Sequence, residues 1–502
     1  MLAWIRSLPL FVLLTGFGVA AMYIPMAFAI RLEDWLVART LFYYTTFLMI
    51  LVSLVAIAVT GYQSRNTARN YLVTVFGAFI IVPALLAMPF NYLVPEVTYF
   101  QAYFEMLSSL TTTGATLFSD PSVLPAPLHL MRALAGWFGG FFMLVVAMSI
   151  FAPLQIGGFE VFNASRGTAR STTQIKSTDA ARRLSRYSRQ IFPIYVLVTA
   201  ILALSLMVAG DRVLVAVIHA MSILSTSGIS PVGGLSGTSS GYVGEALILF
   251  FFVFAISRHW FLGGQETGIL ERLKRDKEVN LALTCMVVIP LLLFVRHFLV
   301  SFEDTIEEET VNALVAVWGG VFTVLSFLTT TGFESAAWEG SRNWSGLGTP
   351  GLILMGLAVM GGGIATTAGG IKLLRVYALY KHGQREVLRL RHPNSVAGQS
   401  QRVRLIRREG AQVAWVFFML FLMSMAVTTL ALGATGMNFA DAMVFAVAAL
   451  SNTGPLVSAA GSGFIDYATI SDAAKAALCL AMVVGRLEAL AVIAVLNPNY
   501  WR

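Results

Sequence analysis

Charged residues are scarce in this sequence. Asp, Glu, Lys and Arg make up only 12% of its 502 residues, and hydrophobic residues make up 57%. Soluble domains carry about 25% charged residues, so this composition excludes an ordinary soluble protein and indicates a polytopic membrane protein. The apolar runs are close to 20 residues long, unlike the alternating ten-residue segments of a membrane barrel, so the sequence predicts an all-α fold.

Cysteine and enzyme motifs are equally scarce. Cys285 and Cys479 both lie in apolar runs, which excludes a disulfide framework or a Cys-rich metal site and favours small buried hydrophobes. There is no P-loop, because the glycines of 361–370 lie in an apolar run with no strand before them. A membrane-embedded enzyme would need paired catalytic groups, but there is no His-x-x-Glu-His set and no second acid beside Glu488. We therefore expect neither enzymatic activity nor a bound organic cofactor.

The net charge of +8 comes from basic residues gathered in a few loops. These loops are 63–70, Arg166–Arg189, Arg272–Lys277 and Lys381–Arg408. The positive-inside rule places them in the cytoplasm and explains the charge without a nucleic-acid partner. The larger loops are suited to a cytosolic protein partner or to anionic lipid headgroups, and both remain open.

The apolar runs predict ten spans, with all basic loops and both termini on the cytoplasmic side. The first run is too long for a signal-peptide core, so we expect it to be retained. The predicted spans are Leu8–Ile30, Trp35–Gly61, Tyr71–Met88, His129–Ile150, Gln190–Ala209, Tyr242–Leu262, Val279–Val300, Pro350–Tyr380, Gln412–Leu432 and Ala473–Leu496.

Four further apolar stretches are predicted to be half-crossings that enter from the other side. That side collects acidic residues, which would raise the local concentration of cations. The half-crossings are Val97–Leu110, Val213–Leu224, Thr310–Leu328 and Phe439–Leu450, and the acids are Glu96, Glu105, Asp120, Glu303, Asp304, Glu307, Glu308, Glu309, Glu334, Glu339, Asp441 and Asp466.

A short polar motif follows each half-crossing. We call these motifs strips 1 to 4: Thr111–Gly114, Ser225–Gly228, Thr329–Gly332 and Ser451–Gly454. Non-helical backbone at membrane depth must be buried in protein or line water, and four such strips around one axis would offer rings of carbonyls to a cation. Glycine permits the backbone dihedrals this requires, and each half-crossing would direct its partly negative C-terminal end at the pore. One copy would be equally typical of helix packing through small residues, but four copies favour an ion filter.

The predicted span Pro350–Tyr380 is too long to cross the membrane as one straight helix. It would run about 46 Å, against a hydrocarbon core of about 30 Å. The residues Gly361, Gly362, Gly363, Thr366, Thr367, Gly369 and Gly370 mark the place where it breaks. The sequence thus predicts a loop at mid-depth beneath the strips that blocks the pore and moves aside, with small-residue helix packing as the alternative.

Arg486 lies deep within the last predicted span. Intramembrane charges are costly and usually face an interior or a water-filled path. Glu488, two residues on, lies on roughly the opposite helix face and is not expected to pair with it. We expect Arg486 to face the pore below the strips, to contact oxygens of the loop and to act as an electrostatic brake on cations. The alternative is an interhelical salt bridge that only holds the helices together.

Over nearly its whole length the chain resembles TrkH-type subunits of the bacterial Trk potassium-uptake system, within the Trk/Ktr/HKT superfamily. The resemblance rests on the strips, two extra N-terminal helices, Gly361–Gly363, 369–372, 392–396, 485–487 and 500–502. It implies a pseudo-fourfold, channel-like, homodimeric protein of the bacterial inner membrane and a cytosolic RCK-type nucleotide-binding ring of the TrkA kind as partner. It also implies K⁺ coordination by the backbone at Thr112, Thr113, Gly114, Thr226, Ser227, Gly228, Thr330, Thr331, Gly332, Asn452, Thr453 and Gly454, with gating by the loop and Arg486.

On this reading the chain divides into 1–70 (two additional helices), 71–165, 166–271, 272–400 and 401–502 (four pore repeats). Two departures from the family pattern stand out: strip 2 is more polar, and Leu456 follows strip 4 where a glycine is more usual. In the superfamily a serine in place of the first filter glycine goes with Na⁺ passage, so four glycines favour K⁺. A Na⁺ permease and a symporter of K⁺ with H⁺ or Na⁺ stay open, although a symporter would be expected to need a titratable group on the path.

Overall fold

The computed structural model describes residues 9–59, 68–152, 178–262, 273, 276–300, 306–344, 351–391, 401–460 and 466–488. These residues form helices and no strands, which confirms the predicted all-α class. Parts of the predicted basic loops (63–67, 166–177, 272, 274–275 and 392–400), the acids 303–304 and the segment 500–502 lie outside the described residues.

The helices are α2 (Leu10–Ala20), α3 (Tyr23–Arg31), α4 (Trp35–Ala58), α5 (Ala68–Leu93), α6 (Tyr99–Leu110), α7 (Ala126–Val146), α10 (Thr178–Val208), α11 (Val213–Ser225), α12 (Gly241–Phe251), α13 (Val253–Ile256), α14 (His259–Leu262), α16 (Lys277–Val300), α17 (Ile306–Leu328), α18 (Trp338–Trp344), α19 (Gly351–Met360), α20 (Leu373–Arg391), α21 (Gln401–Gly433), α22 (Phe439–Leu450), α23 (Leu456–Ala460) and α24 (Asp472–Leu487). A short 3₁₀ turn, η1 (Pro121–Val123), precedes α7, and a π-helical segment, η2 (Ala147–Phe151), follows it.

The four predicted half-crossings are the helices α6, α11, α17 and α22. Each packs between two helices of its own unit: α6 between α5 and α7, α11 between α10 and α12, α17 between α16 and α19, and α22 between α21 and α24. The short helices α18 and α23 also pack on α17 and α22. In addition, α7 packs on α11, α12 on α17, α19 on α22, and α24 on α6. The four units therefore contact one another in a closed cyclic order, which brings the ends of the half-crossings together.

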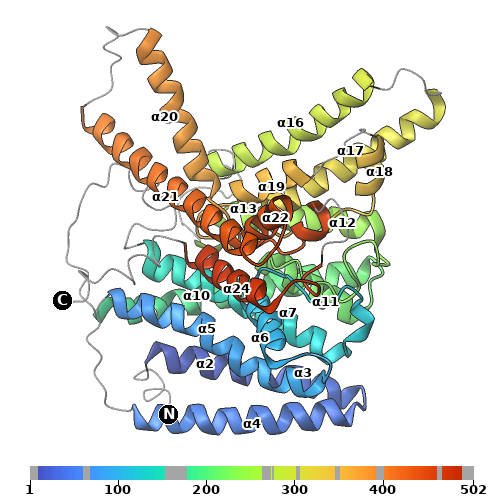
Figure 1. Cartoon of the computed structure of the whole chain (residues 1–502), viewed down its shortest axis with the longest axis vertical. Coiled ribbons are helices and arrows are strands. Elements are labelled where there is room, and N and C mark those ends of the chain that lie inside the picture. Colours follow the sequence, from blue (N-terminus) through green and yellow to red (C-terminus); the bar gives the residue numbers. More distant parts are fainter. Residues whose placement is uncertain are drawn as a thin grey trace.

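The N-terminal helices α2, α3 and α4 lie at one side of the four units (Figure 1). In Figure 1, α4 forms the lower edge, with α2 and α5 above it, while α20 and α21 form one arm at the upper left and α16 and α17 another at the upper right. Large apolar side chains of α4 face outward, among them Phe42, Phe47 and Leu54. By contrast, most of α7 is buried, and its position between α6 and α11 places it in the middle of the molecule.

The prediction of continuous spans was wrong in two places. Seven helices in the described residues are long and apolar enough to cross a membrane, and the other three predicted spans are interrupted or short. The span 242–262 breaks after α13, where Ser257 is extended and its hydroxyl donates to Asp276 (2.8 Å). The last span ends as a helix at Leu487, because Glu488 adopts a left-handed conformation (φ 61°).

The third interruption was predicted. The segment 350–380 divides into α19 and α20 around the loop 361–372, at the glycines that the sequence indicated. Two predicted loops need correction. The second half of 166–189 belongs to α10, which begins at Thr178, and in 381–408 α20 continues to Arg391 and α21 begins at Gln401.

Candidate ion filter and the loop beneath it

Each half-crossing ends in the same backbone turn. In strip 1 the amide of Thr112 donates to the Ser109 carbonyl (2.9 Å) and the amide of Thr113 donates to the Ser108 carbonyl (2.9 Å). The equivalent two bonds are present at the ends of α11, α17 and α22. This pattern is the Schellman motif, which satisfies the last helical carbonyls with the amides that follow.

The second residue of each strip occupies the left-handed region. The φ angles are 56° at Thr112, 55° at Thr226, 59° at Thr330 and 54° at Asn452. This position is usually glycine, and a β-branched residue there is an outlier that costs on the order of 1–3 kcal/mol. Such strain is retained where the surroundings over-determine the backbone, which is typical of functional sites.

The hydroxyls at the first and third positions of each strip bond to each other. The oxygen–oxygen distances are 2.9 Å for Thr111–Thr113, 3.1 Å for Ser225–Ser227, 3.1 Å for Thr329–Thr331 and 3.1 Å for Ser451–Thr453. The first hydroxyl also donates back to a helix carbonyl, as Thr111 does to Leu107 (2.8 Å). These hydroxyls hold the shape of the strip.

Most carbonyls of the strips remain without a hydrogen bond. Among the described residues, no donor reaches the carbonyl oxygens of Thr112, Thr226, Ser227, Thr330, Thr331 and Asn452. Buried carbonyls in native proteins are nearly always paired, so these buried carbonyls are candidate ligands for water or a cation.

The strips meet in ring order. A Cβ on Gly114 would lie 1.8 Å from the Ser227 carbonyl oxygen, and one on Gly228 would lie 2.4 Å from that of Thr331. A Cβ on Gly332 would lie 3.1 Å from the Pro455 side chain, which would also lie 2.8 Å from a Cβ on Gly228, and a Cβ on Gly454 would lie 2.2 Å from the Ala115 amide nitrogen. Strip 1 therefore contacts strip 2, strip 2 contacts strip 3, and strip 4 contacts strip 1, while Pro455, the residue after strip 4, lies against both strip 2 and strip 3; these contacts leave no room for a side chain at Gly114.

Strip 4 differs from the other three. Gly114, Gly228 and Gly332 have positive φ angles, but Gly454 does not, because Pro455 and α23 continue directly from it. Its amide donates to the Thr113 carbonyl (2.6 Å), so strips 4 and 1 are bonded at this level. A cation at that level would have to replace this bond.

In each half-crossing, the residue nine positions before the strip glycine contacts the segment that follows the strip. The type of residue at this position differs among the four. Glu105 Oε2 accepts from the Leu117 amide (3.0 Å), His219 Nε2 contacts the Ser230 hydroxyl (2.9 Å), and Thr323 accepts from the Ser335 amide (3.3 Å). In α22, the half-crossing before strip 4, the equivalent residue is Phe445, whose ring contacts that of Tyr467. The Tyr467 hydroxyl donates to the Gly454 carbonyl (3.0 Å).

The sequence placed Glu105 among the acids of the outer face, and this prediction was wrong. Its side chain is fully buried, and Oε1 lies 2.6 Å from Nη2 of Arg132 on α7. The pair joins α7 to α6, and through the bond from the Leu117 amide to Glu105 it supports the segment that follows strip 1. Glu96, Asp120 and Glu339, in contrast, are exposed.

The glycine-rich loop leaves α19 and closes on itself. The amides of Ile371 and Lys372 donate to the carbonyls of Val359 (2.9 Å) and Met360 (3.0 Å), and Leu373 donates to Gly362 (3.0 Å). A Cβ on Gly361 would lie 2.2 Å from the Gly369 carbonyl, so the two ends of the loop meet without room for a side chain there. The segment 363–369 between these ends is buried.

This buried segment bonds directly to two strips and to Arg486. The Thr367 carbonyl accepts from the Thr226 hydroxyl (2.9 Å) and from Arg486 Nη1 (2.7 Å). The Gly369 amide donates to the Thr330 hydroxyl (2.7 Å), and the Thr367 hydroxyl donates to the Leu224 carbonyl (2.9 Å). The loop thus lies against the half-crossing ends of strips 2 and 3, and Arg486 reaches it from α24.

A buried acid that the sequence analysis did not single out also holds the loop. Glu278, 1% exposed at the start of α16, accepts from the Ile364 amide through Oε1 (2.7 Å). The neighbouring Gly363 amide donates to the Ala255 carbonyl (3.1 Å), at the break in the 242–262 span. Only a contact across 86 residues of chain identifies this role, so no local signal could have found it.

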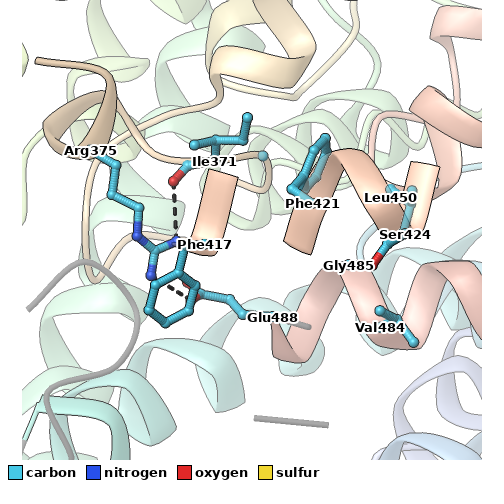
Figure 2. A pocket seen from close by; sticks show the side chains of 10 residues that line it. Ile371, Arg375, Phe417, Phe421, Ser424, Leu450, Val484, Gly485 and Glu488 are labelled. Atoms are coloured by element: carbon cyan, nitrogen blue, oxygen red, sulfur yellow. Dashed lines mark hydrogen bonds and ion pairs between the residues drawn. The ribbon is translucent and has the colours of Figure 1, made fainter. Parts of the chain in front are cut away.

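Glu488 also has a partner that the sequence did not indicate. It pairs with Arg375 of α20 at 2.7 Å, and the Arg375 guanidinium carbon lies 3.8 Å from the centroid of the Phe417 ring. Figure 2 shows Arg375 between Ile371, whose carbonyl accepts from Nη1 (3.2 Å), and Glu488. This pair joins the helix that leaves the loop to the end of the helix that carries Arg486.

Comparisons with known proteins agree with this arrangement. The family model for TrkH, described as a cation transport protein, matches residues 279–501. The Trk system potassium uptake protein TrkH of Salmonella typhimurium is 29% identical over 445 residues, which cover 87% of this chain and 86% of that protein. The Trk system potassium uptake protein TrkG of Escherichia coli is 25% identical, over 81% of this chain and 80% of that protein.

The fold matches a solved structure along its whole length. The crystal structure of the potassium transporter TrkH from Vibrio parahaemolyticus aligns with a TM-score of 0.79, covers 100% of both chains and is 22% identical. Together with the seven apolar helices, these matches show that the chain is a multi-pass membrane protein that is similar to TrkH-type cation transport proteins over most of its length.

Proposed function

We propose that this chain takes up potassium ions across the bacterial cytoplasmic membrane, through a channel-like pore lined by strips 1 to 4. The observation that carries the proposal is the repeated conformation of the strips: each has a left-handed second residue whose carbonyl meets no donor among the described residues, and each has a first and a third hydroxyl that bond to each other. The potassium transport named for the relatives supports K⁺ as the cargo.

The carbonyl oxygens of the strips would replace the hydration shell of the ion. A dehydrated K⁺ gains coordination from backbone dipoles that are already oriented, because the strip amides are bonded inward to the helix ends. The residues we assign to this filter are Thr112, Thr113, Gly114, Thr226, Ser227, Gly228, Thr330, Thr331, Gly332, Asn452, Thr453 and Gly454. In strip 4, passage would require the bond between the Gly454 amide and the Thr113 carbonyl to open.

The loop 361–372 and Arg486 would form the gate. The loop bonds to strips 2 and 3, so ions pass only when the bonds to Thr226 and Thr330 are released. Arg486 holds the loop through the Thr367 carbonyl and adds a positive charge that opposes a cation below the filter.

One observation keeps a second mechanism in view. Glu278 is buried and contacts the loop, and it is the kind of titratable group that a symporter of K⁺ with H⁺ or Na⁺ would use. In the channel-like mechanism the same carboxylate is only an anchor for the loop. A less selective permease that also carries Na⁺ is the remaining alternative.

We further propose that the protein is a homodimer whose basic loops and both termini face the cytoplasm. There the loops would bind a nucleotide-binding ring of the TrkA kind and the headgroups of anionic lipids. The naming of the relatives as parts of a Trk system supports a partner protein.

Uptake of ⁸⁶Rb⁺ into proteoliposomes that contain the purified chain, with and without such a ring, tests the proposal. The membrane potential alone should drive uptake, and external K⁺ should compete more strongly than Na⁺. Uptake that requires an H⁺ or Na⁺ gradient would establish symport, and equal competition by Na⁺ would establish the less selective permease. Absence of uptake under all conditions would refute ion transport by this chain.

A further inference from the structure

The second residue of strip 4 is asparagine, where the other three strips have threonine. The side chains of Thr226 and Thr330 bond to the loop beneath the ring. Asn452 instead donates through Nδ2 to the hydroxyl of Thr113 in strip 1 (3.0 Å) and to the Met482 carbonyl in α24 (3.0 Å). The Asn452 side chain is 1% exposed, so these bonds lie within the protein.

We call the contact between two neighbouring strips a seam. The bonds of Asn452 make the seam between strips 4 and 1 different from the others. Strips 4 and 1 are joined twice, by the Asn452 side chain and by the Gly454 amide on the Thr113 carbonyl (2.6 Å). In the described part of the chain, no hydrogen bond joins strip 1 to strip 2, strip 2 to strip 3, or strip 3 to strip 4. The ring therefore has one fastened seam, which controls how closely strips 1 and 4 can approach or separate.

The same amide group connects the ring to the helix that carries Arg486. Met482 lies one helical turn before Arg486, and Arg486 holds the loop through Thr367. An amide nitrogen has two N–H donors, and Asn452 uses them on two different elements. A threonine hydroxyl has a single donor and cannot make both bonds.

We propose that the Asn452 side chain is a specificity-determining positioning residue, which sets the width of the ring at the seam between strips 4 and 1 and ties it to α24. This inference rests on the proposed function of the strips as a potassium filter. Selection of K⁺ over Na⁺ requires that the ring resists contracting around the smaller ion. Loss of the seam bond removes part of that resistance, so Na⁺ passes more readily.

The substitution Asn452→Thr tests the side chain and leaves the backbone undisturbed. Thr112, Thr226 and Thr330 already adopt the φ angle that this position requires. Thr113→Val removes the acceptor of the seam bond at nearly constant shape, together with the bond to the Thr111 hydroxyl. Thr111→Val removes that second bond and keeps the seam bond, so it is the matched control. Ser458→Ala serves as the control, because Ser458 is exposed on α23 and donates only to the Pro455 carbonyl (2.8 Å).

The measurement is the ratio of K⁺ to Na⁺ flux in proteoliposomes of the full chain and its variants. We expect Asn452→Thr and Thr113→Val each to lower the ratio about tenfold, the equivalent of one buried hydrogen bond. The double variant should fall no further, and Ser458→Ala should match the unmodified chain. If Asn452→Thr does not fold, the fall in the ratio in Thr113→Val beyond that in Thr111→Val decides the question.

The outcomes separate this inference from the proposed function. An unmodified chain that carries no K⁺ refutes the function itself. A selective unmodified chain whose ratio is unchanged in Asn452→Thr or in Thr113→Val overturns the role of Asn452 and leaves the function standing. Additive losses in the double variant also overturn it, because the two side chains would then act separately.

Discussion

Replacing Arg486 by alanine should open the pathway in the absence of any cytosolic partner. The guanidinium is 3% exposed and donates to the Thr367 carbonyl at 2.7 Å. Its Nε and Nη2 atoms have no hydrogen-bond partner within the described residues, so the bond to the loop is its specific contact there. The substitution removes this bond and also removes the positive charge below the strips.

The size of the effect follows from the bond that is lost. A hydrogen bond to a charged group contributes about 1.5–3 kcal/mol, which corresponds to a shift of about 10- to 150-fold in the equilibrium between a held and a released loop. The Thr367 carbonyl keeps its bond from the Thr226 hydroxyl, so the loop is loosened and not freed entirely. Uptake of ⁸⁶Rb⁺ without the partner ring should therefore rise by one to two orders of magnitude.

The matched variant Arg486→Lys separates charge from contact. Lysine retains the positive charge but lacks the planar fork of donors, so its uptake should lie between that of the unmodified chain and that of Arg486→Ala. Unchanged uptake in Arg486→Ala, at equal protein incorporation, would refute the gating role and leave Arg486 as a structural residue.

Three further substitutions test other parts of the site. Gly332→Ser places a side chain against strip 4 at a positive φ (81°), and the flux ratio of K⁺ to Na⁺ should fall; an unchanged ratio would remove strip 3 from the filter. Glu278→Ala deletes the acceptor of the Ile364 amide and should raise uptake without the partner ring. Glu278→Gln retains an acceptor oxygen, so its uptake should stay near that of the unmodified chain. If the protein is a symporter, both variants should instead lose coupled transport. Glu105→Ala leaves the Arg132 charge buried and unpaired, at a cost of about 3–5 kcal/mol, and should lower the melting temperature in detergent; an unchanged melting temperature would show that the pair does not support strip 1.

The positions of most apolar helices could be predicted from sequence because apolar length is a local property. Phe439–Leu450 was predicted as a half-crossing and forms α22 with the same bounds. The break after α19 followed from too great a length and from clustered glycines. Contact between Arg486 and a loop oxygen was also predicted, because a buried charge needs a partner and the loop is the nearby source of polar groups.

The features that escaped prediction depend on residues far apart in the chain. The break at Ser257 is stabilised by Asp276, and Glu488 pairs with Arg375, which lies 113 positions earlier. Helix geometry correctly excluded Glu488 as a partner of Arg486, but it could not supply the partner on another helix. Propensity also misleads at Thr112, because a threonine would not be expected in the left-handed region without the constraint of the surrounding ring.

The hydroxyls of the strips have a different role from the one that a polar motif first suggests. Thr111 and Thr113 use their hydroxyls on each other and on the helix end, and this pattern recurs in every strip. The atoms left for a cation are the backbone carbonyls, as the sequence analysis favoured, and a direct test of these ligands is available.

Crystals of the protein grown in Rb⁺ or Tl⁺ provide that test through anomalous scattering. The central claim predicts anomalous peaks on the axis between the four strips, within coordination distance of the carbonyl oxygens of Thr112, Thr226, Thr330 and Asn452, and a loss of those peaks when Na⁺ replaces the heavier ion. Ordered ions elsewhere in the protein, with no density between the strips, would contradict the account.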